Sequence, residues 1–423
     1  MRLDRAVAGW LSMIVGFFGL GLASPGRALG EFALRDGDTV VFLGDSITAA
    51  RTYGKIIENY TLLRFPDRKV RFINAGWGGD TAAGGLKRLD RDVFDRGATV
   101  LIVAYGINDI GWGLKADAEH KRIYLNAIRG IIEKCKARGI RVYIGSAAIT
   151  AEHPDAAEQG FLQTMCDEGL ALARSMGEHD IDIQRAMRRI QWTVLKANAS
   201  AQPKDQATLH APDGIHLSDL GQLAMAFAIL KGLGAPAEVS SASIDAAGPK
   251  IVATSGCRIT KLTGTAADGR LAFDRLDDGL PVNFGIFGAL QFRYVPIPDE
   301  LNRYMLTVTN LPEGRYEILT DGRAVGTFTS QQLATGLNIA SATADGWEPG
   351  GPWDAEAGIL IHLTDARSQV AEALRSLDQY LPNHPEGTTL HAQYRELDDR
   401  IEAVQRTLLT RRPFHFVIRL AAK

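Results

Sequence analysis

The pattern of apolar and polar positions between residues 36 and 235 changes its period repeatedly along the chain. Four short runs rich in β-branched and other apolar residues have the length and composition of strands, at 38–44, 69–75, 98–106 and 140–147. The third run is almost continuously apolar, which is expected for a strand buried on both faces. These runs predict a sheet that other elements cover on both sides.

Longer segments between these runs carry apolar side chains three and four positions apart, which predicts helices. They span 53–65, 82–94, 117–138, 161–176, 183–197 and 219–230. Strands that alternate with helices of this length form βαβ units and a parallel sheet. We therefore expect residues 34–235 to form an α/β domain with three αβα layers around a central parallel sheet. Such sheets bind ligands outside the carboxyl ends of their strands.

The pattern of apolar and polar positions changes after residue 235. Residues 236–248 are mostly small, contain Gly and Pro and show no period, so we interpret them as a linker. Short β-type runs with Pro-Glu-Gly and Asp-Gly turn signals predict a small antiparallel β region at 249–345. Apolar stripes at helical spacing predict a helical hairpin at 355–410. The alternating segment 413–420 predicts a returning β-strand.

The first thirty residues have a different composition. Met1–Arg5 carries two Arg and one Asp, Ala6–Ala23 has no charged residue, and small residues follow up to Ala28. This order is typical of a secretory signal peptide, so we interpret residues 1–28 as a signal that is cleaved after Ala23 or Ala28. An uncleaved membrane anchor is the alternative, because an apolar run of this length just spans a bilayer. We expect a periplasmic or extracellular protein without stable membrane insertion after cleavage.

Composition and charge narrow the classes of function. The 423 residues are 46% hydrophobic and 23% charged, which is ordinary for a globular protein of two or three domains. The formal net charge of −2 disfavours nucleic acid as a partner. Three cysteines are too few for a disulfide scaffold, and the sequence has no CxxC or HExxH motif. We expect neither a metal nor another cofactor.

Four short blocks of polar residues and glycines lie where predicted strands end or where the last helix begins. They are Gly44-Asp45-Ser46, NAGWGGDT at 74–81, YGIND at 105–109 and DGIH at 213–216. The ends of parallel strands meet at one edge of a sheet, so we expect these blocks to lie near one another. Each block alone has a plainer interpretation, as a turn, a flexible loop or a helix cap.

Together the four blocks contain the groups that ester hydrolysis requires. Ser46 can be the nucleophile, and His216 can be the base that takes its proton. Asp213 lies three residues before His216 and can orient the imidazole. The backbone N–H groups of Ser46 and Gly79 and the side-chain amide of Asn108 can donate hydrogen bonds to the oxyanion.

A metal site is the rival interpretation of the last block. His210, Asp213 and His216 are spaced three residues apart, but Pro212 and Gly214 disfavour the helix that would place them on one face. His210 can also compete with His216 as the base, but it lacks a carboxylate at the offset that Asp213 has from His216. The sequence therefore favours a catalytic serine over a metal.

The four blocks resemble those of the SGNH, or GDSL, hydrolases, a family named for a Ser, a Gly, an Asn and a His in separate blocks. The resemblance covers residues 36–235 and implies a flavodoxin-like three-layer fold. Trp77-Gly78 departs from the family, in which many members have a small polar residue there. The region after residue 245 is more loosely similar to the accessory β region of some exported bacterial members. The residues that the resemblance assigns to catalysis are Ser46, Asp213 and His216, and those that it assigns to the oxyanion hole are Ser46, Gly79 and Asn108.

The resemblance implies a secreted serine esterase that acts on a small-molecule or polysaccharide ester. A carbohydrate acetyl ester is our preferred substrate. An O-acyltransferase would use the same residues, and a noncatalytic carbohydrate-binding protein would use the region after 245. Trp77, Tyr105 and Trp112 are candidate substrate-binding residues, because aromatic rings at a pocket rim can stack on sugars or acyl chains. Their plainer interpretation is that they cover the edge of the sheet.

Overall fold

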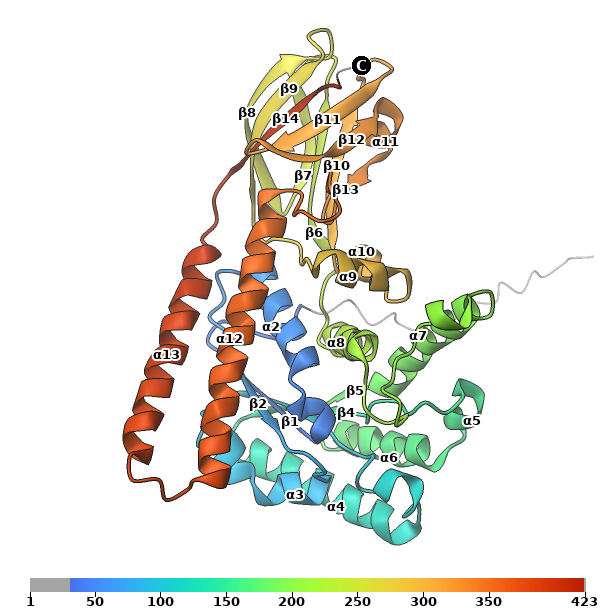
Figure 1. The fold of residues 1–423 in the computed structure, drawn as a ribbon, viewed down its shortest axis with the longest axis vertical. Helices are drawn as coiled ribbons and strands as arrows, with labels where there is room; N and C mark the ends of the chain where they lie inside the picture. The colour runs from blue at the N-terminus through green and yellow to red at the C-terminus, as the bar shows by residue number, and fades with distance from the viewer. Residues whose placement is uncertain (1–30, 422–423) are drawn as a thin grey trace, which may run out of the picture.

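The computed structural model describes residues 31–421, so the segment that we interpret as a signal peptide lies outside the described residues. The first domain is built on a five-stranded parallel sheet (Figure 1), with strand order β2-β1-β3-β4-β5. Gly44 pairs with Gly76 on one side and with Ala104 on the other, so three neighbouring strands end at the same level. The strands are β1 (Thr39–Gly44), β2 (Arg71–Gly76), β3 (Val100–Ala104), β4 (Arg141–Gly145) and β5 (His179–Ile181).

Helices cover both faces of this sheet. Successive residues of β3 enter opposite cores: Val100 and Ile102 contribute to one, and Leu101 and Val103 to the other. This is why the sequence of β3 is continuously apolar. The expected three-layer αβα fold is confirmed. The helices on the first face are α2 (Thr52–Arg64), α7 (Ile183–Asn198) and α8 (Asp219–Gly232), and those on the second are α3 (Ala82–Lys87), α4 (Ala118–Lys136) and α6 (Phe161–Ser175).

Two details of this domain differ from the sequence-based expectation. The segment 82–94 is not one helix, because α3 ends at Lys87 and a π-helical turn, η1 (Asp90–Phe94), follows it. The strand β5 was not expected, because its three residues are too few to show a period and include His and Asp. Only its pairing with β4 defines it. The remaining short elements are α1 (Ser46–Ala49), η2 (Gly111–Gly113), α5 (Pro154–Glu158) and η3 (Pro203–Asp205).

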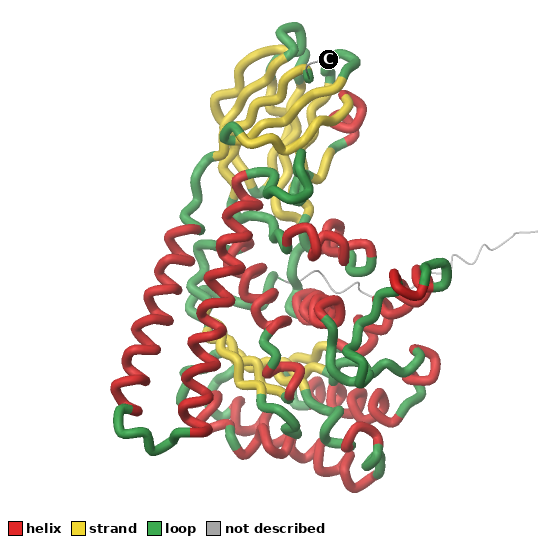
Figure 2. The backbone as a smooth tube through the Cα atoms, in the orientation of Figure 1, coloured by secondary structure: helices red, strands yellow, loops and turns green. Residues whose placement is uncertain are grey.

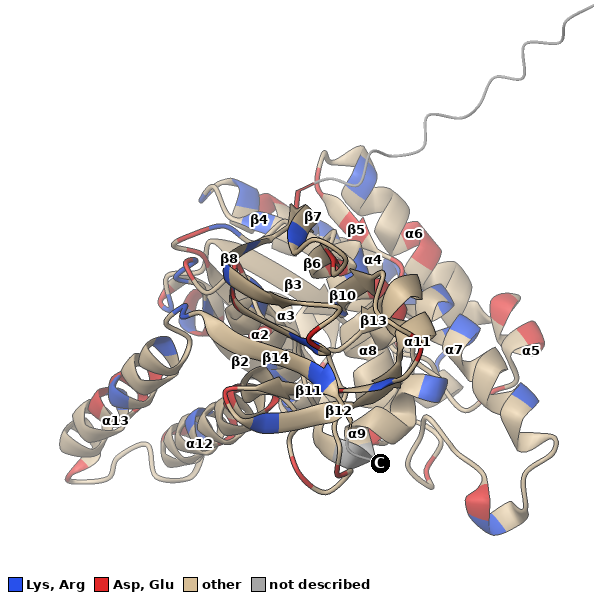
Figure 3. Ribbon diagram, turned by 90° about the horizontal axis from the view of Figure 1, so that it is seen from above, with Lys and Arg blue, Asp and Glu red and all other residues tan. Residues whose placement is uncertain are grey.

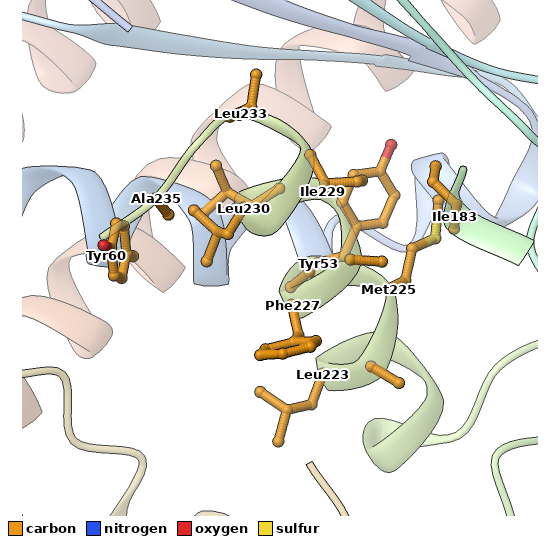
Figure 4. Close-up of a cluster of buried hydrophobic side chains, with 14 of the residues drawn as sticks. Tyr53, Tyr60, Ile183, Leu223, Met225, Phe227, Ile229, Leu230, Leu233 and Ala235 are labelled. Atoms are coloured by element: carbon orange, nitrogen blue, oxygen red, sulfur yellow. The ribbon is translucent and has the colours of Figure 1, made fainter. Parts of the chain in front are cut away.

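Helix α8 is buried on all sides rather than on one stripe. Figure 4 shows its apolar side chains around Tyr53, Tyr60 and Ile183. Residues from beyond the first domain join the same core, including Val282, Ile297 and Leu301. Part of the chain after the first domain therefore shares the apolar core of that domain.

The chain after α8 forms two further sheets, which make the strand-rich end of the molecule in Figure 2. Their strand orders are β13-β10-β6-β7 and β12-β11-β14-β9-β8, and residues such as Phe273, Tyr304 and Phe416 form a core that both sheets share. The strands are β6 (Glu238–Asp245), β7 (Lys250–Ser255), β8 (Cys257–Thr265), β9 (Arg270–Asp277), β10 (Arg303–Thr309), β11 (Arg315–Thr320), β12 (Arg323–Thr329), β13 (Leu337–Asn338) and β14 (Phe414–Leu420). Short helices between them are α9 (Gly285–Ala289), η4 (Leu290–Arg293), α10 (Ile297–Glu300) and α11 (Ser330–Thr335).

The predicted linker at 236–248 is wrong, because most of it is the strand β6. This strand pairs in parallel with β10 and antiparallel with β7. Its buried side chains include Ser240 and Ala242, which are too small to give the apolar alternation that marks a strand in sequence. Pairing on both sides, rather than local sequence, determines its structure.

Two long helices, α12 (Pro352–Tyr380) and α13 (Gly387–Leu408), form an antiparallel pair beside α2 and β2 (Figure 1). Figure 3 shows charged residues on both helices. Their contacts with the first domain include buried polar ones: Thr364 Oγ1 lies 2.6 Å from Asn59 Oδ1, and Arg367 Nη1 donates to Glu58 Oε1 at 2.9 Å. Within residues 31–421, no helix has both the length and the apolar character needed to cross a bilayer.

Candidate active site

Ser46 is the first residue of α1, and Asp45 alone separates it from the end of β1 at Gly44. Asp45 caps this helix, because its Oδ1 accepts a hydrogen bond from Ile47 N at 2.9 Å. Gly44 is required by close packing: a Cβ there would lie 2.1 Å from Thr48 Oγ1 and 2.8 Å from the carbonyl oxygen of Ala104. The Gly-Asp-Ser block therefore forms a tight strand-to-helix turn, and this turn positions the Ser46 hydroxyl.

The structure brings Ser46 and His216 together although they are 170 residues apart in sequence. Ser46 Oγ lies 2.9 Å from His216 Nε2, and His216 Nδ1 lies 2.6 Å from Asp213 Oδ2. Nδ1 faces a carboxylate, so it carries the proton, and Nε2 is free to accept the hydrogen bond of the serine hydroxyl. This line of hydrogen bonds is the geometry that an activated serine nucleophile requires.

The loop that carries Asp213 and His216 is held by its own backbone. Asp213 Oδ1 accepts hydrogen bonds from Ile215 N and His216 N, each at 2.9 Å. The hydrogen bond from His216, followed by these two N–H groups, lowers the pKa of Asp213 to about 2. The carboxylate is therefore ionised across the physiological range and fixes the orientation of the imidazole.

The two expected oxyanion donors other than Ser46 lie on adjacent loops. Gly79 has φ +73°, a left-handed conformation that glycine adopts without strain, and the space where a Cβ would lie is empty. Conformation, rather than crowding, therefore explains the glycine. Asn108 Nδ2 donates to the carbonyl oxygen of Asp80 at 3.0 Å, so its amide is tied to the Gly79 loop.

Arg88, which sequence reasoning missed, anchors the strand ends beneath this site. Its guanidinium donates to the carbonyl oxygens of Gly44 (3.1 Å) and Ala75 (2.7 Å) and to Asp80 Oδ2 (2.8 Å). The residue ties β1, β2 and the Gly79 loop together. Arg88 is the C-cap residue of α3, and nothing in the local sequence distinguishes this anchor from a solvated arginine.

The structure contradicts a substrate-binding role for Tyr105. Its side chain is 1% exposed, and its hydroxyl donates to Asp80 Oδ2 at 2.8 Å and accepts from Arg88 Nη2 at 2.7 Å. Tyr105 is therefore part of the anchor, because its hydroxyl is hydrogen-bonded to both Arg88 and Asp80. The sequence does not reveal these two partners.

The two tryptophans lie in different places. Trp112 is 53% exposed, and its ring meets that of His216 edge-on, with the centroids 6.0 Å apart. Trp77 instead lines a groove of about 840 Å³ between β2 and α12–α13, where the guanidinium carbons of Arg91 and Arg375 lie 5.3 and 5.8 Å from its ring centroid. Ser46 and His216 do not line that groove. Of the two, only Trp112 contacts the catalytic groups.

Two buried carboxyl groups lie behind the nucleophile. Burial raises the pKa of Asp45 to about 6 and that of Asp109 to about 7. Asp109 Oδ1 accepts a hydrogen bond from Ala82 N at 3.0 Å, at the start of α3, whereas its Oδ2 has no hydrogen-bond partner among the described residues. Both groups favour the neutral form more strongly than exposed carboxyl groups do.

The rival metal interpretation finds no support in the placement of His210. Its Nε2 donates to the carbonyl oxygen of Ile149 at 3.1 Å, so this ring nitrogen is already used in the fold. Among the described residues, the one group of three side chains compact enough for a metal is Asp398, Asp399 and Glu402. The Arg71 guanidinium contacts all three, at 2.8–3.5 Å, and so occupies the space between them.

The fold and these contacts define an α/β protein of the ester-hydrolase class. The model of the GDSL-like lipase/acylhydrolase family matches residues 42–224. These residues, less than half of the chain, form a domain similar to this family, and the protein is a hydrolase that acts on ester bonds. The resemblance inferred from the four sequence blocks is thereby confirmed.

Comparison with solved structures extends the likeness beyond this domain. BT4096, a gut microbial diltiazem-metabolizing enzyme, is 22% identical with a TM-score of 0.78, covering 92% of this chain and 98% of its own. LAE5, an α/β hydrolase from the metagenome of Lake Arreo, Spain (21% identical, TM-score 0.40), covers 48% of this chain and 98% of its own. The acetylxylan esterase Axe2 from Geobacillus stearothermophilus (20% identical, TM-score 0.39) covers 48% and 96%. A search of curated proteins found no match. The fold shared with BT4096 therefore includes the sheets and helices after residue 235.

Proposed function

We propose that this protein is an exported serine esterase that hydrolyses carboxylic esters through an acyl-Ser46 intermediate. The observation that carries the proposal is the line of hydrogen bonds from Ser46 Oγ through His216 to Asp213, at 2.9 and 2.6 Å. Ser46 Oγ attacks the acyl carbon while its proton passes to His216 Nε2. Asp213 stabilises the imidazolium that forms.

The negative charge on the acyl oxygen needs hydrogen-bond donors. The N–H groups of Ser46 and Gly79 and one N–H of Asn108 are the proposed donors, and losing one such donor typically lowers kcat by about 10²- to 10³-fold. His216 then protonates the leaving alcohol, which leaves the acyl group on Ser46. Water, deprotonated by His216, attacks the acyl carbon and releases the acid and the free serine.

A carbohydrate acetyl ester is the proposed substrate. The side chains of His216 and Asp213 are 38% and 39% exposed, so the site opens to solvent and can accept an ester displayed on a bulky chain. The exposed indole of Trp112 beside His216 offers an aromatic surface at the same opening. The same exposure would admit a sugar hydroxyl in place of water, which favours O-acyl transfer as the second candidate function.

The test uses Ser46→Ala with p-nitrophenyl acetate, butyrate and octanoate and with acetylated xylan. We expect kcat to fall by about 10⁵- to 10⁶-fold in this variant. Ser200→Ala, at an exposed loop serine, is the matched control and should keep the wild-type rate. Comparing acetate release with acetyl transfer to an added oligosaccharide separates hydrolysis from transfer. Full activity of Ser46→Ala would refute Ser46 as the nucleophile, whereas a wild-type protein with neither esterase nor transferase activity would favour a noncatalytic binding role.

Export is a separate part of the proposal and rests on the composition of residues 1–28. N-terminal sequencing of the protein from the periplasmic and extracellular fractions should give a chain that begins after Ala23 or Ala28. An intact N-terminus in the membrane fraction would instead indicate the uncleaved anchor.

A further inference from the structure

The turn Gly111-Trp112-Gly113 has an unusual backbone next to the site. All three residues have positive φ values, of 51°, 58° and 96°, and Trp112 is the one that is not glycine. A left-handed conformation is unfavourable for a residue with a side chain, because its Cβ comes too close to the following carbonyl oxygen. Because Trp112 is 53% exposed, burial of its ring does not explain why it is held in this conformation.

The indole of Trp112 contacts two groups of the proposed active site at once. Its Nε1 donates a hydrogen bond to Asn108 Oδ1 at 2.9 Å. Its ring stands at 82° to the ring of His216. The turn is fixed by hydrogen bonds from Trp112 N to the carbonyl oxygen of Ile107, at 3.0 Å, and from Lys115 N to that of Ile110, at 2.9 Å.

These contacts leave one orientation for the Asn108 amide. An indole N–H can only donate, so it must meet Oδ1, and the carbonyl oxygen of Asp80 can only accept, so it must meet Nδ2. A flipped amide would place N–H against N–H and oxygen against oxygen. In the observed orientation, Nδ2 gives one hydrogen to Asp80 and keeps the other for the substrate oxyanion.

We propose that Trp112 is a positioning residue that locks the Asn108 amide with its N–H toward the oxyanion. This inference rests on the proposed function, because it assumes that Asn108 donates to a transition-state charge. Trp112 acts through Asn108 rather than on the reacting atoms. Its hydrogen bond also polarises the amide, which strengthens the remaining N–H as a donor.

The hydrogen bond predicts a specific kinetic signature. The oxyanion exists only in the transition state, so loss of the lock lowers kcat and leaves KM nearly unchanged. Trp112→Phe keeps an aromatic ring beside His216 but removes the N–H. We expect kcat to fall about tenfold, which matches the loss of one neutral hydrogen bond. A role in stacking on substrate would instead raise KM.

A double-mutant cycle tests the coupling directly. Asn108→Ala should lower kcat by about 10²- to 10³-fold. In that background, Trp112→Phe should change kcat less than twofold, because the amide on which Trp112 acts is gone. Equal losses in both backgrounds, or a Trp112→Phe variant within twofold of wild-type kcat, would overturn the proposal.

The matched control is Trp192→Phe, at another exposed tryptophan whose ring meets a histidine, His153, edge-on at 5.1 Å but outside the site. It should leave kcat and KM unchanged. A second readout holds even if Trp112→Phe is unstable: in ¹⁵N-labelled wild-type protein, the Trp112 indole N–H should exchange with solvent more slowly than the indole N–H of Trp192, although both rings are exposed. Equal exchange rates of the two indole N–H groups would contradict the lock. Ser46→Ala tests the proposed function separately, so the two failures are distinguishable.

Discussion

Substitution of Asp213 by Asn should damage catalysis more than its complete removal. In the structure, Asp213 Oδ1 accepts from two backbone N–H groups, at 2.9 Å each, and Oδ2 faces His216 Nδ1 at 2.6 Å. The two N–H groups require an acceptor, so in Asp213→Asn the amide oxygen takes the place of Oδ1. The NH₂ group then faces Nδ1 and forces that nitrogen to accept a hydrogen bond.

The consequence is a change of tautomer. With Nδ1 as acceptor, the proton of the neutral imidazole moves to Nε2, the atom that lies 2.9 Å from Ser46 Oγ. That nitrogen can no longer take the serine proton. The same change in a serine triad typically lowers kcat by about 10⁴-fold. We expect a loss of about 10³- to 10⁴-fold here, because the imidazole is 38% exposed and water can stabilise some of the productive tautomer.

Asp213→Ala removes the acceptor without supplying a donor, so water can accept the Nδ1 proton and the productive tautomer survives. Its kcat should therefore exceed that of Asp213→Asn. The assay is steady-state hydrolysis of p-nitrophenyl acetate, with thermal unfolding to confirm the fold. Asp219→Asn, in the first turn of α8, is the matched control and should be fully active. An Asp213→Asn variant that keeps more than a tenth of wild-type kcat, or that exceeds Asp213→Ala, would refute this reasoning.

Two further predictions concern backbone strain and pH. Gly79→Ala should lower kcat by about tenfold or more, because φ +73° strains alanine and shifts a proposed oxyanion donor. Gly78→Ala is the control and should leave kcat unchanged, because Gly78 has no positive φ. Equal effects of both variants on kcat would contradict the role of Gly79. Burial raises the pKa of Asp354 to about 8, so the folded chain holds this proton more tightly than the unfolded chain does. The free energy of unfolding should therefore fall as pH rises from the ordinary carboxyl range toward 8, and Asp354→Asn should reduce that fall. Urea unfolding at pH 5 and pH 8 measures it, and an identical pH dependence of the two proteins would show that Asp354 is not the cause.

The local sequence was sufficient to predict an element or a site residue wherever one short segment contains all the residues that determine it. Strand β3 enters two cores, so every one of its residues had to be apolar, and the pattern is visible without neighbours. The four polar blocks were visible because tight turns and chemically active groups restrict the residue types in them. The residue types of the candidate catalytic groups, and the family that residues 42–224 resemble, therefore followed from sequence.

Elements whose structure depends on partners were not predictable in this way. Strand β6 has small side chains and was interpreted as a linker, yet strands on both sides define it. Tyr105 and Trp112 looked alike as aromatic residues near a strand end. One is buried against Arg88 and Asp80, and the other is exposed against His216.

The sequence by itself determined the alternation of strands and helices and the chemical groups available at the strand ends. The tertiary structure decided which of those groups meet: it placed Ser46 beside His216, and Trp112 against Asn108. The physical reason is that periodicity and turn chemistry are local properties of the chain. A hydrogen bond between side chains 170 residues apart depends on the register of the sheet and on anchors such as Arg88, whose partners lie on other segments.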